Sequence, residues 1–188
     1  MKVQVRQGVF ETNSSSTHAI SIMPFFGNVD WYKNYRVPMH VHFGLSHEFG
    51  WEFAEYDDLL AKAAYFWITC CSEYCYLSEK HNLDDIKATV TEWLIEEGVE
   101  EVTFAEGAYK EASWKKEDGR SVEDYMYLDF DGYVDHSDIE FAELLLSNKK
   151  IFLSYLFDSD SVINTGNDND DREVEYAAGA KWTFYKGN

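Results

Sequence analysis

Proline and cysteine are scarce in this sequence, and long hydrophobic runs are absent from it. The 188 residues include 2 prolines and 3 cysteines, and no apolar stretch approaches the roughly 18 residues of a membrane-spanning helix. Cys70, Cys71 and Cys75 are odd in number and crowded together, which excludes the even disulfide framework of a small secreted protein. Residues 1–11 also lack the apolar core of a signal peptide. We therefore expect a soluble protein of a reducing, cytoplasmic compartment, with the thiols used for packing.

Basic residues are the second scarce class, and their shortage is uneven along the chain. Sixteen Lys and Arg face 35 Asp and Glu, which gives a net charge of −19. Residues 92–143 hold seventeen carboxylates and four cations, a net charge of −13, whereas residues 1–47 carry +2. Such an acidic surface disfavours direct binding to nucleic acid or anionic lipid and attracts a basic protein surface or multivalent cations. Solubility alone is the competing interpretation.

Apolar and aromatic residues are plentiful, at 45% and 17% of the chain, so the length of one domain can enclose a core. Alternating apolar residues predict strands over 3–10, 18–23, 37–43 and 99–105. Helical spacing from Asp57 to Cys75 predicts a central helix, because the segment is apolar on most sides. A second helix is expected from the N-cap Asn82 to the stop at Gly98.

The second half of the chain gives a less regular pattern. Residues 106–124 are polar and predict an irregular surface excursion, and residues 125–134 predict a hairpin turning at Asp131-Gly132. The spacing of Ser137 and Glu140 is that of a capping box before a short helix ending near Leu146. The apolar run 151–157 favours an interior strand, and residues 164–171 are turn-rich. The expected fold is a single α+β domain over residues 1–188, with a mixed or antiparallel sheet packed against two to three helices.

The segment 6–18, RQGVFETNSSSTH, has the densest collection of reactive side chains. A Ser-rich turn can receive a phosphate or another anion, Glu11 or His18 could act as a base, and Arg6 could neutralise developing charge. The structural alternative is a hydroxyl-rich loop that satisfies its own backbone. If the segment is a site, its expected catalytic residues are Glu11, His18 and His136. Its expected binding residues are Arg6, Asn13, Ser14, Ser15, Ser16, Asn167, Asp168 and Asn169.

Two further clusters raise the question of a metal ion. His40 and His42 alternate on a strand near His47 and Glu48, but no spacing indicates a third or fourth ligand. Asp129, Asp131, Asp135 and His136 form an acidic cluster, and residues 167–171 resemble a calcium loop without its Gly and distal Glu. Solvated turns explain the acidic cluster and residues 167–171. We predict no metal site, and the sequence indicates no particular cofactor.

The segment 9–18, VFETNSSSTH, resembles the opening of a family of uncharacterised proteins from phages, prophages and gut Firmicutes. Shorter similarities follow at residues 48–52 (EFGWE), 62–66 (KAAYF), 135–136 (DH) and 165–169 (TGNDN). The resemblance implies a mobile-element origin, and hence the host bacterial cytoplasm. It supplies no catalytic residues, but it strengthens the case that residues 6–18 are functional.

Two functions remain open from the sequence. The first is a non-enzymatic, phage-type inhibitor of host defence, an anti-CRISPR or anti-restriction protein that binds the basic surface of a nuclease and competes with DNA. Its expected contact residues are Glu96, Glu97, Glu100, Glu101, Glu117, Asp118, Glu123 and Asp124. The second is a small enzyme that acts on a nucleotide or another phosphorylated substrate through residues 6–18. An accessory structural protein is the third possibility.

Overall fold

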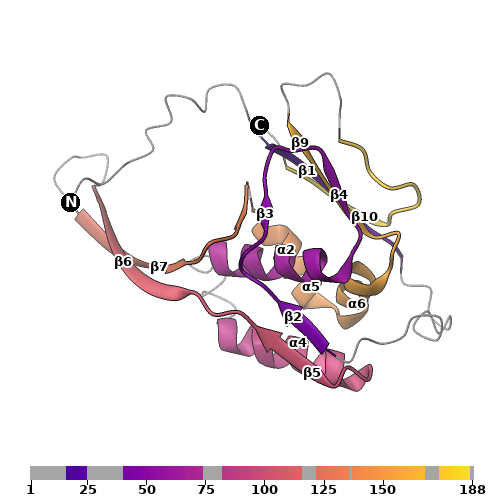
Figure 1. Cartoon of the computed structure of the whole chain (residues 1–188), viewed down its shortest axis with the longest axis horizontal. Helices are drawn as coiled ribbons and strands as arrows, with labels where there is room; N and C mark the ends of the chain where they lie inside the picture. Colours follow the sequence, from indigo (N-terminus) through magenta and orange to yellow (C-terminus); the bar gives the residue numbers. More distant parts are fainter. Residues whose placement is uncertain are drawn as a thin grey trace.

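Helix α2, Leu59–Ser72, lies at the centre of the computed structural model (Figure 1). The structure describes residues 16–24, 40–73, 82–115, 122–135, 137–167 and 174–186. Asp58 caps the helix, because its carboxylate accepts a hydrogen bond from the Ala61 amide at 2.9 Å. Every residue from 61 to 71 is buried, so the prediction of a central helix is confirmed.

A four-stranded antiparallel sheet lies beside this helix, with the strand order β10-β1-β9-β4. The strands are β1 (Ser16–Ile22), β4 (Ala54–Tyr56), β9 (Val162–Asn167) and β10 (Trp182–Lys186). One face of β1 enters the core through Ile20 and Ile22. On the other face, the Ala177 amide donates to Ser21 Oγ at 2.9 Å. Strand β1 is therefore covered on both sides, and all seven of its residues are buried.

The remaining strands form three separate pairs (Figure 1). Strand β2 (His40–Phe43) runs parallel to β5 (Glu101–Phe104), and the short β3 (Glu48–Phe49) runs parallel to β8 (Tyr133–Val134). Strands β6 (Ala108–Lys115) and β7 (Val122–Asp129) form an antiparallel ribbon. Helix α4 (Leu83–Glu96) leads into β5. As predicted, Asn82 caps it by accepting from the Asp85 amide at 2.7 Å, and Gly98, at φ +97°, follows its end.

Helices α5 (Ile139–Ser147) and α6 (Lys149–Phe157) complete the core. The prediction of a strand over 151–157 is wrong, because these residues form most of α6. They are all buried, including Ser154, so the run has no regular alternation of polar and apolar residues to distinguish helix from strand. Asn148 was the available signal, since its side chain caps α6 by accepting from the Lys150 amide at 2.9 Å. The predicted capping box is also displaced: Asp138 caps α5, and Ser137 donates to Glu73.

Two predictions for residues 106–134 are also wrong. Residues 106–124 include strand β6, and residues 125–134 do not fold back on themselves, because β7 pairs with β6 and β8 pairs with β3. Residues 108–111 of β6 are all exposed, so this part of the strand shows no alternation of buried and exposed positions. Residues 164–167, predicted as a loop, lie in β9, where Asn164 and Thr165 hydrogen-bond to the carbonyls of Glu175 and Glu52.

Lys62 of α2 is a buried cation inside this fold, with 1% of its surface exposed. Its Nζ donates to the carbonyls of Asp158 at 2.8 Å and Ser161 at 3.1 Å, which ties α2 to the turn between α6 and β9. Desolvation by burial lowers the pKa of Lys62 to about 8, against the opposing effect of the nearby carboxylates of Asp158, Asp57 and Asp58.

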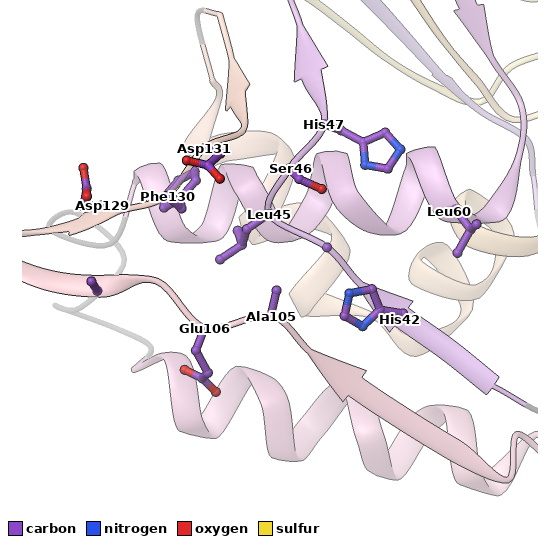
Figure 2. A pocket seen from close by; sticks show the side chains of 12 residues that line it. His42, Leu45, Ser46, His47, Leu60, Ala105, Glu106, Asp129, Phe130 and Asp131 are labelled. Carbon is purple, nitrogen blue, oxygen red and sulfur yellow. The ribbon is translucent and has the colours of Figure 1, made fainter.

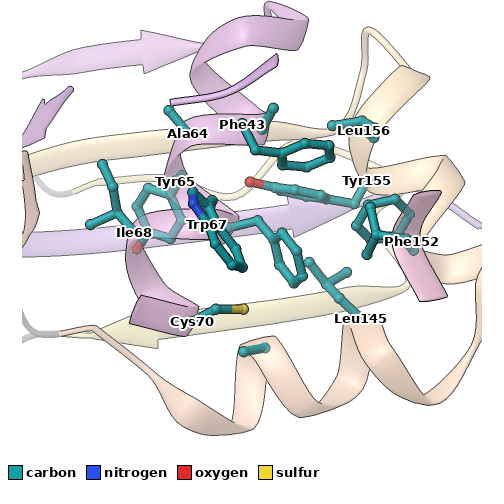
Figure 3. Close-up of a cluster of buried hydrophobic side chains, with 14 of the residues drawn as sticks. Phe43, Ala64, Tyr65, Trp67, Ile68, Cys70, Leu145, Phe152, Tyr155 and Leu156 are labelled. Atoms are coloured by element: carbon teal, nitrogen blue, oxygen red, sulfur yellow. The ribbon is translucent and has the colours of Figure 1, made fainter. Parts of the chain in front are cut away.

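The architecture is α+β, as predicted, with four helices and ten strands in the part of the chain that the structure describes. One connected hydrophobic cluster joins α2, α4, α5 and α6 to the strands around them. Figure 3 shows its centre, where Trp67 and Tyr65 of α2 lie among buried side chains that include Tyr155 of α6. No helix within the described ranges is long and apolar enough to cross a membrane.

Candidate functional site

His18, an expected catalytic residue, lies inside the protein. It belongs to β1, has 1% of its surface exposed, and its Nδ1 lies 2.9 Å from the hydroxyl of Tyr65 on α2. Burial, assisted by the charge of Asp138, raises the pKa of Tyr65 far above its usual range, so the hydroxyl stays neutral. The pair therefore joins the four-stranded sheet to the central helix.

Ser16 and Asn167, two of the expected binding residues, are brought together at one end of the sheet. They are register partners on the adjacent strands β1 and β9, and Asn167 Nδ2 donates to the carbonyl of Trp51 at 3.4 Å. Ser16 is fully buried. The other expected residues of this site lie outside the described part of the chain: Arg6, Glu11, Asn13, Ser14, Ser15, His136, Asp168 and Asn169.

Two residues of the expected acidic face, Glu96 and Glu97, form ion pairs with a lysine from α6. Lys149 lies 2.7 Å from carboxylate oxygens of both Glu96 and Glu97. Although partial burial lowers it, these two hydrogen bonds raise the pKa of Lys149 overall. Glu100 and Glu101 are exposed beyond this group. Glu123 and Asp124 lie on β7, paired with Trp114 and Ser113, and Glu117 and Asp118 lie outside the described residues.

A cleft of about 490 Å³ opens beside these elements, and we call it the acidic cleft (Figure 2). It is lined by residues 44–47 after β2, by residues 105 and 106 after β5, by residue 108 at the start of β6, by residues 129–131 at the end of β7, and by His42 and Leu60. The parallel strands β2 and β5 both end at it, which is where parallel strands commonly present ligand sites. The volume lies within the range of small-ligand pockets.

Backbone hydrogen bonds hold the walls of the acidic cleft in place. Amides of Gly132 and Tyr133 donate to the carbonyls of Leu45 at 2.7 Å and His47 at 3.0 Å. A Cβ on Gly132 would lie 2.6 Å from the His47 oxygen and 2.7 Å from the Leu45 oxygen. Only glycine therefore allows this close approach of the two backbones. On the opposite wall, Trp67 Nε1 of α2 donates to the Ala105 carbonyl at 2.9 Å.

Carboxylates supply the full charges of this lining, and no Lys or Arg is among its residues. Glu106 Oε1 accepts from Lys87 Nζ at 2.6 Å, and Asp129 Oδ2 accepts from Lys110. The hydrogen bond to Asp129 raises the pKa of Lys110. Asp131 is exposed and forms no hydrogen bond or ion pair with the described residues. Figure 2 shows Asp131 and Glu106 on opposite walls, with Leu45 and Ala105 between them.

Two imidazoles line the end of the cleft nearer Leu60. His42 Nδ1 lies 2.8 Å from Thr103 Oγ1, and the His47 ring stacks on Phe49 with centroids 5.9 Å apart. His42 Nε2 and His47 Nδ1 lie 3.8 Å and 4.0 Å from the position of a Cβ on Gly44, so the glycine leaves space between the rings. No three His, Cys, Asp or Glu side chains within the described ranges are placed to hold a metal ion.

The sequence indicates only some of the residues that line the acidic cleft. Asp129 and Asp131 stand out as an acidic pair, but Glu106, Phe130 and Leu60 carry no motif. The missing signal was the parallel pairing of β2 with β5, which brings the segments after both strands to the same place. Comparisons with models of protein families, with curated proteins and with solved structures found no match to this chain.

Proposed function

We propose that this protein is a non-enzymatic binding protein that occupies the basic, nucleic-acid-binding surface of a partner. The observation that carries the proposal is the acidic cleft, whose fully charged lining residues are Glu106, Asp129 and Asp131. Glu100 and Glu101 add exposed negative charge at the start of β5. Complementary charge accelerates encounter with a Lys- and Arg-rich groove and repels nucleic acid from the same protein.

The resemblance of residues 9–18 to phage and prophage proteins suggests what such a partner is. A phage protein gains by blocking the host's nucleases, and a nuclease must present a basic groove to hold DNA. The concrete form of the proposal is therefore an anti-CRISPR or anti-restriction protein in the bacterial cytoplasm. It would compete with DNA for the nuclease without chemical change to either.

The alternative of a phosphorylated-substrate enzyme at residues 6–18 receives less support. A catalytic base must come within hydrogen-bond reach of the substrate. His18 has 1% of its surface exposed, and its Nδ1 lies against Tyr65. Use of His18 as a base would require the β1–α2 packing to open.

DNA binding by purified Cas nucleases and restriction endonucleases, measured against increasing concentrations of this protein, tests the proposal. We expect at least one nuclease to lose DNA binding, with an apparent affinity that falls as salt is added. The double variant Glu100→Lys/Glu101→Lys should weaken the competition about tenfold, because it reverses two exposed charges on the proposed contact face.

The matched control is Glu55→Lys/Glu175→Lys, which makes the same change in net charge at exposed positions on and beside the four-stranded sheet. It should leave the competition within about twofold of the wild type. Unchanged DNA binding by every nuclease at low salt, or an equal loss in the control, would contradict the proposal.

A further inference from the structure

We infer that the acidic cleft is a receptor for an arginine side chain of the partner. The inference rests on the proposed function and names the group that the surface recognises. An apolar wall and carboxylates on separate walls would be redundant in a surface that acts through net charge alone. They are the features of a pocket that takes one cationic side chain from a basic surface.

The apolar part of the cleft suits the aliphatic stem of such a side chain. Leu60 is the second residue of α2 and lies at the mouth of the cleft. Its side chain is 55% exposed and is not part of the hydrophobic core. Leu45 is buried below, and Phe130 is half-buried on the wall of Asp131. A methylene stem laid along these side chains would remove apolar surface from water while its charged head reached the carboxylates.

Oxygens for the charged head remain available despite the two lysines. Lys87 is bonded to Glu106 through Oε1, and Lys110 is bonded to Asp129 through Oδ2. A carboxylate has two oxygens and about four acceptor positions, so Glu106 Oε2 and Asp129 Oδ1 can accept further bonds. Asp131, with neither hydrogen bond nor ion pair to the described residues, provides both of its oxygens and is the expected main contact.

The geometry favours arginine over lysine. A guanidinium is planar and can bond a carboxylate through two N–H groups, whereas an ammonium is a compact point charge. Its flat face also stacks on aromatic rings, and the cleft offers the rings of Phe130, His42 and His47. A nucleic acid is disfavoured by like charge, and a metal ion by the absence of a ligand triad in the described part of the chain.

Fluorescence anisotropy with labelled nona-arginine and nona-lysine peptides at low salt tests the inference on the full chain. We expect the arginine peptide to bind more tightly. Asp131→Asn should weaken that binding about tenfold, since it removes a charge-assisted bond, and Leu60→Lys should weaken it further by placing a cation at the mouth. Both positions are exposed, so the variants should fold.

Two variants match these changes elsewhere. Glu55→Gln removes a carboxylate from β4, and Ile95→Lys adds a cation at a position of α4 that is 47% exposed; both should bind like the wild type. If neither peptide binds, the proposed function and the arginine receptor both fail. If the peptides bind but the cleft variants match their controls, or lysine binds as well as arginine, the proposed function stands and the receptor is refuted.

Discussion

Replacement of Lys62 by methionine tests whether the centre of the fold holds a cation at a thermodynamic cost. Burial lowers the pKa of Lys62 from 10.5 to about 8, so between these values the unfolded chain carries a proton that the folded chain has released. The folded state is therefore favoured as pH rises through this window. The shift corresponds to about 3 kcal/mol in total, or at most about 1.4 kcal/mol per pH unit.

The assay is urea unfolding of the wild type and Lys62→Met between pH 7.5 and 10, followed by tryptophan fluorescence. The difference in unfolding free energy is the quantity to follow, because Cys71 and other buried acids have raised pKa values and lose their own stabilising contribution above pH 9. We expect wild-type stability to rise relative to the variant by roughly 2 kcal/mol over this interval. A difference that stays flat with pH would refute the burial argument for Lys62.

Two further predictions concern the walls of the cleft and the buried histidine. Gly132→Ala should cost about 2 kcal/mol of stability and weaken nona-arginine binding, because its Cβ would press on the Leu45 and His47 carbonyls. Thermal unfolding measures the loss of stability, and anisotropy measures the loss of binding. A wild-type melting temperature would contradict the geometry. Tyr65→Phe should cost about 1–2 kcal/mol in urea unfolding, because it removes the hydroxyl that lies against His18 Nδ1 inside the protein. Peptide binding should stay unchanged. Lost binding with intact stability would instead place His18 in a functional site.

Local signals in the sequence were sufficient for helix α4. Asn82 and Gly98 delimit α4 through side-chain and backbone preferences that act within a few residues. Two of the errors fall where solvent exposure is uniform along a segment. Residues 151–157 are all buried and residues 108–111 are all exposed, so neither segment has an alternation of polar and apolar residues to reveal its period.

The candidate site was harder to predict because its residues meet only through tertiary structure. Asp131 and Glu106 belong to different connections, and the cleft exists because β2 pairs in parallel with β5 while β8 pairs with β3. Strand register between distant segments is not written in either segment alone. The chemical richness of residues 6–18 points to His18 as a base, whereas its position in β1 leaves it with 1% of its surface exposed.

The position of β1 between β9 and β10 also determines when the sheet can form during synthesis of the chain. Residues 16–22 pair with residues 162–167 on one side and with residues 182–186 on the other, so the ribosome releases the first strand long before either neighbour exists. Contacts of such sequence separation form slowly, and until then the residues that β1 buries in the folded protein are accessible to chaperones and proteases. A nascent chain halted before residue 162 therefore contains helix α2 without the sheet that covers it, and the fold closes only after its last strand has been made.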